Sequence, residues 1–260
     1  ARASPLAADR PGVGWLDSYD RVVANSAFTA RWVQQWWGRP SEVVPPPVGL
    51  RQPGAKDHVI LSVGRFFAPG RGHAKKQLEM VEAFRQLGRL AAGWELHLVG
   101  GCSPEDRGYL GQVQRAAAGL PVVLHVDATG AELDALYQRA AIYWHATGLG
   151  EDLDADPVRA EHFGITTVEA MSAGAVPVVI DAGGQPEIVR DGMEGLVFHD
   201  LDGLVERTRD LLGDPSRRAR LARSAEERAR RYGIEAFGER FSSLVGDIVD
   251  HPRAWQGGAS

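Results

Sequence analysis

From residue 58 onwards the sequence alternates short apolar runs with longer stretches of helical periodicity, and this alternation constrains the fold more than any other feature. The apolar runs occupy residues 58–63, 95–99, 122–126, 142–145, 176–180 and 195–198. The remaining stretches predict helices at residues 75–91, 104–119, 131–139, 164–174, 184–191 and 201–213. Because repeated strand and helix units form parallel strands with crossover helices, we expect an α/β fold, a doubly wound parallel sheet with helices on both faces. Ligands of such sheets bind at the carboxyl ends of the strands.

The segments on either side of this repeat predict less regular structure. Residues 1–20 are rich in Ala, Pro, Gly and Asp without sustained periodicity, so we expect them to be irregular. A short strand at 22–25 follows, and Ser26 is a suitable N-cap for a helix to about Trp37. The three prolines of SEVVPPPVGL then predict a linker. Two further helices are expected after Pro215.

Composition limits the kinds of partner that the chain can have. Its 260 residues with 44% apolar content are enough to bury a core, and the net charge of −5 argues against nucleic-acid binding. The single cysteine, Cys102, cannot form an internal disulfide, and no apolar run reaches 18 residues, so we expect a cytoplasmic protein. Because the chain does not begin with Met and its first fifty residues look truncated, we expect a fragment of a longer protein.

Seven arginines between residues 217 and 231 raise the question of a membrane surface. A basic helix can bind anionic lipid, which would place the protein at the inner face of a membrane. The interleaved Ala, Leu and Glu residues fit a solvated helix face better. Peripheral membrane contact is therefore not the favoured interpretation.

The stretch AEHFGITTVEAMSAGAVPVVI at residues 160–180 carries the strongest chemical signal. It predicts a helix that starts near Gly164, with Glu161 just before the helix and Glu169 within it. The free N–H groups around Gly164, Ile165 and Thr166 favour an anion, phosphate above all. Carboxylates bind sugar hydroxyls, so the combination predicts a nucleotide-sugar site.

A glycine-rich basic loop, GRFFAPGRGHAKKQ, leaves the first strand of the repeat at residues 64–77. Glycine lets the backbone approach a phosphate, and Arg and Lys neutralise its charge. By itself such a loop is more often a solvated surface loop. Its glycines and cations are Gly64, Gly70, Gly72, Arg65, Arg71, Lys75 and Lys76.

Together these residues carry a resemblance to a known family. The E-x7-E pair of Glu161 and Glu169, followed by EAMSAGAVPVV and then by GGQPEIV at 183–189, resembles the donor-binding domain of the retaining glycosyltransferases of family 4, which have the GT-B fold. Matching features extend from about Arg21 to about Phe241. The resemblance implies that the predicted sheet is Rossmann-like and forms the C-terminal, donor-binding half of such an enzyme.

The resemblance also implies which cations hold the donor. Arg65 and Lys75 match the family residues that bind the donor diphosphate, with Ala83 fixing the register of the K-x7-A pattern. Lys76 is the adjacent alternative. Gly64 belongs to the same strand-G-R pattern and is expected to line the donor site.

The two carboxylates receive different roles from the resemblance. Glu169 matches the residue that accepts hydrogen bonds from the ribose hydroxyls, although a helix-surface glutamate is the simpler alternative. Glu161 matches the residue near the transferred sugar, where its charge orients hydroxyls or stabilises the positive charge that develops at the anomeric carbon. Its alternative is a carboxylate favoured by the helix dipole. We expect Glu161 to be catalytic with Arg65 and Lys75, without any carboxylate acting as nucleophile.

Two histidines adjoin this region. His145 ends a strand, and His162 follows Glu161, where many family members have a small residue. Their spacing fits no zinc pattern, so we expect no metal, and they either line the ligand or make structural hydrogen bonds. Phe163 completes the expected donor site, and no dinucleotide fingerprint supports NAD.

We therefore expect three regions: residues 1–44 as the end of an acceptor domain with the linker, 45–232 as the donor domain, and 233–260 as a helix that crosses back. The resemblance implies a metal-independent hexosyltransferase without cofactor that takes UDP- or GDP-linked sugars. The fragment should bind donor but lack activity without its N-terminal acceptor domain. The alternatives are a non-catalytic interaction module, or a GT-B relative that catalyses epimerisation or phosphorolysis.

Overall fold

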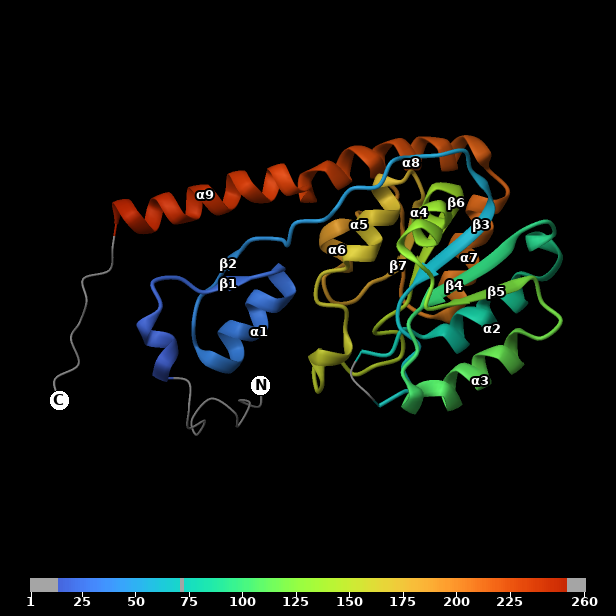
Figure 1. The fold of residues 1–260 in the computed structure, drawn as a ribbon, viewed down its shortest axis with the longest axis horizontal. Helices are drawn as coiled ribbons and strands as arrows, with labels where there is room; N and C mark the ends of the chain where they lie inside the picture. The colour runs from blue at the N-terminus through green and yellow to red at the C-terminus, as the bar shows by residue number, and fades with distance from the viewer. Residues whose placement is uncertain (1–13, 71–72, 252–260) are drawn as a thin grey trace.

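The computed structural model describes residues 14–70 and 73–251, and a six-stranded parallel sheet lies at its centre (Figure 1). The strand order is β5-β4-β3-β6-β7-β8, with every neighbouring pair parallel. The strands are β3 (Asp57–Val63), β4 (Glu95–Gly100), β5 (Val122–Val126), β6 (Ala140–His145), β7 (Val176–Ile180) and β8 (Leu196–Phe198). The six predicted strands are confirmed.

The predicted helices are also present, but several are shorter than expected. They are α2 (Gln77–Leu87), α3 (Arg107–Ala117), α4 (Gly130–Arg139), α5 (Ile165–Ser172), α6 (Gln185–Ile188) and α7 (Leu201–Leu212). The α2 helix begins after Lys76, because that residue has φ 62° and an α-helix cannot continue through a left-handed residue. The segments Gly88–Ala91 and Pro104–Asp106, predicted as helical ends, form short 3-10 helices.

Helices cover both faces of the sheet, as predicted (Figure 1). The α2, α3 and α7 helices share one core with Trp144, whereas α4 and α5 share another with the preceding residue, Tyr143. Successive residues of a strand point to opposite faces, which is why two neighbouring aromatic residues of β6 enter different cores. The indole N–H of Trp144 donates to Thr208 Oγ1 at 3.0 Å, so this fully buried ring leaves no polar group unpaired. The α8 helix (Pro215–Ala229) contributes to the packing on both sides.

The strand order changes direction between β3 and β6. From β3 the sheet extends through β4 to β5, and from β6 it extends in the opposite direction through β7 to β8. Loops that leave two such strands diverge, and a crevice for ligands opens between their carboxyl ends. The described parts of the loop after β3, residues 64–70 and 73–76, thus lie at the same edge of the sheet as the segment after β6, residues 146–164.

A smaller unit precedes the sheet. It consists of β1 (Val23–Ala24), α1 (Ala27–Trp37) and β2 (Glu42–Val43), and the two strands form a separate parallel pair. The predicted short strand and helix are confirmed, and the predicted N-cap Ser26 accepts from the N–H of Thr29 at 3.0 Å. A 3-10 helix (Gly14–Ser18) lies within the segment expected to be irregular, and residues 1–13 lie outside the described residues.

The N-terminus of α1 is anchored to the main unit by a carboxylate. The backbone N–H groups of Ala27 and Phe28 donate to the two carboxylate oxygens of Glu187, in α6, at 2.8 and 2.7 Å. These N–H groups have no acceptor within α1, and a negative charge at a helix N-terminus is stabilised by the helix dipole. Glu187 therefore fixes α1 beside the sheet.

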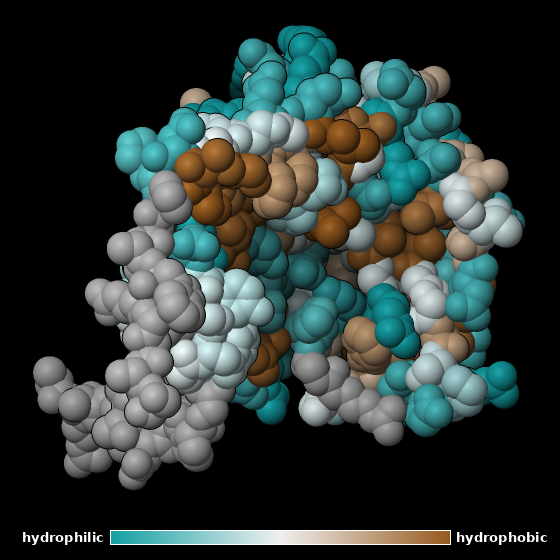
Figure 2. Space-filling model, turned by 60° about the vertical axis from the view of Figure 1, so that its left-hand side comes forward, coloured by the Kyte–Doolittle hydropathy of each residue, from teal (hydrophilic) through white to brown (hydrophobic). Residues whose placement is uncertain are grey.

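The last predicted helix is α9 (Ile234–Asp250), which projects from the sheet towards the side where α1 lies (Figure 1). It exposes Ile234, Phe241, Val245 and Val249, which recur at helical spacing and which we call the α9 stripe. Figure 2 shows several exposed hydrophobic patches on the side of the molecule from which α1 and α9 project. Within the described residues, no helix is long and apolar enough to cross a membrane.

Candidate functional site

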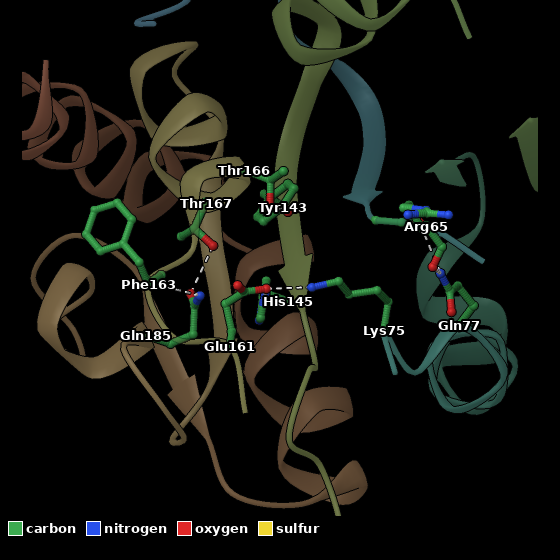
Figure 3. A network of polar contacts seen from close by, with 11 residues as sticks. Arg65, Lys75, Gln77, Tyr143, His145, Glu161, Phe163, Thr166, Thr167 and Gln185 are labelled. Carbon is green, nitrogen blue, oxygen red and sulfur yellow. Dashed lines mark hydrogen bonds and ion pairs between the residues drawn. The ribbon is translucent and has the colours of Figure 1, made fainter. Parts of the chain in front are cut away.

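At the carboxyl ends of β3 and β6, side chains from several segments converge on Glu161 (Figure 3). Its Oε2 lies 2.6 Å from Lys75 Nζ, in the loop after β3, and 3.3 Å from His145 Nε2, at the end of β6. The Glu161 side chain is 20% exposed and that of His145 is 4% exposed. Three residues that are distant in the sequence thus form one polar cluster at the predicted edge of the sheet.

Gly64 allows the lysine to reach this cluster. A Cβ atom on Gly64 would lie 2.7 Å from Lys75 Cγ, so the aliphatic part of the lysine side chain occupies the space that any other residue would need. The loop ends are held by the buried Gln77, whose Nε2 donates to the carbonyls of Gly64 and Arg65 at 3.1 and 3.0 Å. Sequence reasoning did not select Gln77, because it lay inside a predicted helix and nothing local indicates its carbonyl partners.

The other cations of this loop have different partners. Lys76 points to Glu151, with its Nζ 2.6 Å from Oε1, so the two adjacent lysines contact different carboxylates. Arg65 is exposed, and its guanidinium carbon lies 4.6 Å from the centre of the Phe67 ring. In Figure 3 it lies on the side of Lys75 away from Glu161. Arg71 and Gly72, also predicted to belong to this loop, lie outside the described residues.

The GGQP segment, residues 183–186, holds the backbone of Glu161 in place. The N–H of Gly184 donates to the Glu161 carbonyl at 2.8 Å. Gly183 has φ 62°, and a Cβ atom there would lie 2.1 Å from the same carbonyl oxygen. The two glycines therefore allow their backbone to approach the backbone of Glu161 closely, and this contact fixes the position of Glu161.

We expect Gly183→Ala to destabilise the fold more than Gly192→Ala does. Both glycines have positive φ, 62° and 72°, so the conformational cost of an L-residue is shared. At Gly192 a Cβ atom meets nothing within 4 Å, whereas at Gly183 it collides with backbone. Chemical denaturation should give an additional loss of about 1–3 kcal/mol for Gly183→Ala. Equal losses for the two variants would contradict the close approach.

The N-terminus of α5 lies next to Glu161. Gly164 precedes the helix with φ 115°, and the helix begins at Ile165, whose N–H has no carbonyl one turn earlier to accept it. The hydroxyl of Tyr143 donates to Thr166 Oγ1 at 2.7 Å. Phe163 is buried against the ring of Tyr232, with ring centres 5.5 Å apart. The predicted anion-binding turn is thus rigidly held.

Glu169 lies further along α5 and belongs to a separate cluster. Its Oε1 accepts from Arg51 and its Oε2 from the hydroxyl of Tyr137, at 2.9 Å. Glu161 precedes the helix and contacts Lys75, whereas Glu169 lies within the helix and contacts Arg51, so the structure places the two carboxylates in separate polar clusters. Sequence reasoning selected neither Arg51 nor Tyr137.

Three histidines surround the Lys75 and Glu161 pair. The ring of His162 lies 6.2 Å from the ring of His73 and 6.2 Å from that of Phe28, in α1, measured between centres. His73 was not among the predicted site residues. A histidine in a glycine-rich basic loop is the signal that could have indicated it.

The pKa values of the cluster are set by burial and by contacts between its members. Burial alone would raise the pKa of Glu161, but the hydrogen bond from His145 and the positive charge of Lys75 outweigh it and hold this pKa below its ordinary value. Burial lowers the pKa of His145, and burial followed by the charge of Lys75 lowers that of His73. At neutral pH the cluster therefore contains an ionised Glu161 paired with Lys75, with His145 and His73 neutral.

In the described part of the chain, no group of three or more His, Cys, Asp and Glu side chains is arranged to hold a metal ion. The charges available to balance an anion in the crevice are those of Arg and Lys. An ammonium group and a guanidinium group bind phosphate oxygens through charge-assisted hydrogen bonds.

The family described as "Glycosyl transferases group 1" matches residues 51–228 of the chain. A GDP-Man:Man(3)GlcNAc(2)-PP-Dol alpha-1,2-mannosyltransferase of Dictyostelium discoideum is 22% identical over 251 residues, 88% of this chain and 47% of the relative. A D-inositol 3-phosphate glycosyltransferase of Segniliparus rotundus is 27% identical over 264 residues, 92% of this chain and 54% of the relative. The chain thus spans about half the length of the curated relatives it matches.

Solved structures share the fold. A sucrose-phosphate synthase of Thermosynechococcus elongatus superposes with a TM-score of 0.72 at 23% identity, over 89% of this chain and 59% of that protein. Anabaena HepE in complex with UDP and glucose gives a TM-score of 0.71 at 19% identity, over 87% and 62%. At these identities the likeness concerns the fold alone.

Proposed function

The chain belongs to the group 1 glycosyl transferases and has the GT-B type of fold, and on this premise we propose that it binds a nucleotide-diphosphate-sugar as the donor-binding part of a retaining, family 4 glycosyltransferase. One observation carries the proposal. A lysine from the loop after β3 and a carboxylate before α5 meet at 2.6 Å, at the crevice where ligands of doubly wound sheets bind. The alternative, a non-catalytic module, predicts that these two side chains face away from a common cleft.

Lys75 and Arg65 bind the diphosphate in this proposal. Lys75 is paired with Glu161, and the exposed side chain of Arg65 lies over the ring of Phe67. An incoming diphosphate draws Lys75 from Glu161, because a doubly charged anion offers it more acceptor oxygens than one carboxylate does. The first N–H groups of α5, at Ile165 and Thr166, face the same anion.

Glu161 acts at the sugar. Once Lys75 has moved to the diphosphate, the ionised carboxylate accepts hydrogen bonds from sugar hydroxyls, and its charge stabilises the positive charge that develops at the anomeric carbon. The bond from this carbon to the phosphate oxygen breaks, the bond to the acceptor oxygen forms on the same face, and the acceptor proton passes to the leaving phosphate. Lys75 and Arg65 stabilise the charge on the departing diphosphate, so the proposed reaction requires no metal.

The remaining donor contacts follow from position. Glu169 accepts hydrogen bonds from the ribose hydroxyls, and Gly64 lets the backbone approach the ligand. His145 and His162 line the sugar, on either side of Glu161. Lys76, tied to Glu151, supports the loop and leaves Lys75 as the lysine that contacts the donor.

An acceptor domain completes the enzyme in this proposal, as the relatives' greater length suggests. Residues 1–44 are the end of that domain and the linker. Two features support the division. The parallel pair β1 and β2 has only two strands and leaves Val23 and Val43 exposed, whereas parallel sheets are normally larger and covered on both faces. The α9 stripe is a second apolar face, and α9 crosses back to cover that domain.

Isothermal titration calorimetry with UDP, GDP and ADP tests the proposal directly. We expect at least one of the three to bind this chain, while the chain alone transfers little sugar. The absence of binding by all three at millimolar concentration contradicts the proposal. Product analysis with labelled donor and the full-length protein separates transfer from epimerisation and phosphorolysis.

A further inference from the structure

The carboxylate of Glu169 is held by one donor on each oxygen. Arg51 Nη2 donates to Oε1, and the Tyr137 hydroxyl donates to Oε2 at 2.9 Å. The Glu169 side chain is 13% exposed. Neither partner belongs to the loop and helix start that make up the proposed diphosphate site.

Arg51 is itself fixed in place by several contacts. Its backbone N–H donates to Ser172 Oγ at 2.8 Å, at the end of α5. Its other terminal nitrogen donates to Asp134, in α4, and its guanidinium carbon lies 5.3 Å from the centre of the Tyr137 ring. The segment that follows the linker is thus tied to α4 and α5 through one side chain.

Tyr137 can only donate to Glu169. It is fully buried, and burial raises the pKa of its phenol well above the ordinary value, so the hydroxyl keeps its proton at neutral pH. The donated proton and that of Arg51 prevent the Glu169 carboxylate from rotating about its last bond. The orientation of this group is therefore set before any ligand arrives.

A carboxylate oxygen accepts two hydrogen bonds. With one taken on each oxygen by Arg51 and Tyr137, one lone pair on each remains for a ligand. Two neighbouring hydroxyl groups, such as the 2′- and 3′-hydroxyls of ribose, match two such acceptors on one rigid carboxylate.

We propose that Arg51 and Tyr137 are positioning residues that orient Glu169 for a vicinal diol, so that the site selects ribonucleotides over 2′-deoxyribonucleotides. This inference rests on the proposed function. It adds to it a specificity device in which the segment after the linker, and not only the donor loop, determines how the nucleoside is recognised.

The test is the ratio of affinities for a ribonucleotide and its 2′-deoxy counterpart, UDP against 2′-deoxy-UDP or GDP against 2′-deoxy-GDP, measured by calorimetry. In the unaltered protein we expect a preference for the ribonucleotide of about 10-fold or more, the range for a hydrogen bond to a charged group. Tyr137→Phe and Arg51→Met should each reduce this ratio severalfold by weakening ribonucleotide binding, with little change for the deoxy compound. Arg51→Lys retains the charge without the paired geometry and should give an intermediate ratio.

Tyr143→Phe is the matched control, because it removes a buried hydroxyl that donates to Thr166 instead of Glu169. It should leave the ratio at the value of the unaltered protein. A ratio that stays unchanged in Tyr137→Phe overturns the inference while leaving the proposed function intact. Tighter ribonucleotide binding by Arg51→Met also overturns it, because Arg51 would then be an occluding competitor. Failure of every nucleotide to bind contradicts the proposed function instead.

Discussion

Replacing Lys75 with methionine is expected to weaken binding of the nucleoside diphosphate by about 100-fold, which corresponds to roughly 3 kcal/mol for a desolvated charge pair. Two effects add. The diphosphate loses its charge-assisted hydrogen bond, and Glu161, which is largely buried, loses its cationic partner at 2.6 Å and repels the incoming anion. Calorimetric titration of the variant with UDP or GDP measures the loss.

The matched control for this change is Arg89→Met. Arg89 is exposed in the 3-10 helix Gly88–Ala91 that follows the far end of α2, whereas Lys75 lies just before the beginning of the same helix. Arg89→Met removes one positive charge at the opposite end of α2. The affinity for the nucleoside diphosphate should change by less than about 3-fold, as expected for a remote surface charge. If both variants weaken binding equally, net charge explains the effect and Lys75 does not contact the diphosphate.

Replacing Glu161 with glutamine is expected to impair sugar transfer without weakening nucleotide binding. Binding of the nucleoside diphosphate should stay the same or become tighter, because Lys75 no longer has to leave a carboxylate. Sugar transfer by the full-length protein should fall about 10²- to 10³-fold, the range for losing one group that stabilises charge in the transition state. Labelled-donor assays measure transfer, and calorimetry with UDP and the matching UDP-sugar, or GDP and its sugar, separates the two binding terms.

Glu206→Gln controls for the loss of one carboxylate. Glu206 is exposed in the middle of α7, so neither transfer nor binding should change. Full transfer activity in Glu161→Gln would remove Glu161 from the proposed chemistry. Weakening of nucleotide and nucleotide-sugar to the same extent would assign it a structural role in the crevice.

The double variant Lys75→Met, Glu161→Gln tests whether the two residues act as a pair. Their side chains are in direct contact, so their effects should not add. We expect the double variant to bind the nucleoside diphosphate more tightly than Lys75→Met alone, because it no longer leaves an unpaired buried carboxylate. Strict additivity would contradict the charge balance that the contact implies.

Much of the fold follows from patterns between neighbours in the sequence. The six strands and their helices were predicted because apolar periodicity is a short-range property, and strand and helix alternation allows few topologies. The residue at which α2 begins could not be predicted in the same way. Lys76 adopts φ 62°, and its side chain reaches Glu151, 75 residues away, so a tertiary contact accompanies a conformation that local propensity disfavours.

The candidate site also combines contacts that the sequence predicted with contacts that it did not. The resemblance predicted that Lys75 and Glu161 would lie in one site, and the structure brings them into contact across 86 residues of sequence. It did not indicate that Arg51, 118 residues from Glu169, would occupy one oxygen of that carboxylate. His73 and Gln77 were also missed, because their partners come from other elements or from loop carbonyls.

By itself, the sequence determined the class of fold, the position of each strand and the residue types able to bind a phosphate and a sugar, since these depend on periodicity and on chemistry carried by single residues. Only the tertiary structure decided which lysine meets Glu161, what holds Glu169 and how α1 is anchored at Glu187. The physical reason is that hydrogen bonds and ion pairs act over a few ångströms. The pairing of β3 with β6 brings within that range side chains that no local pattern connects.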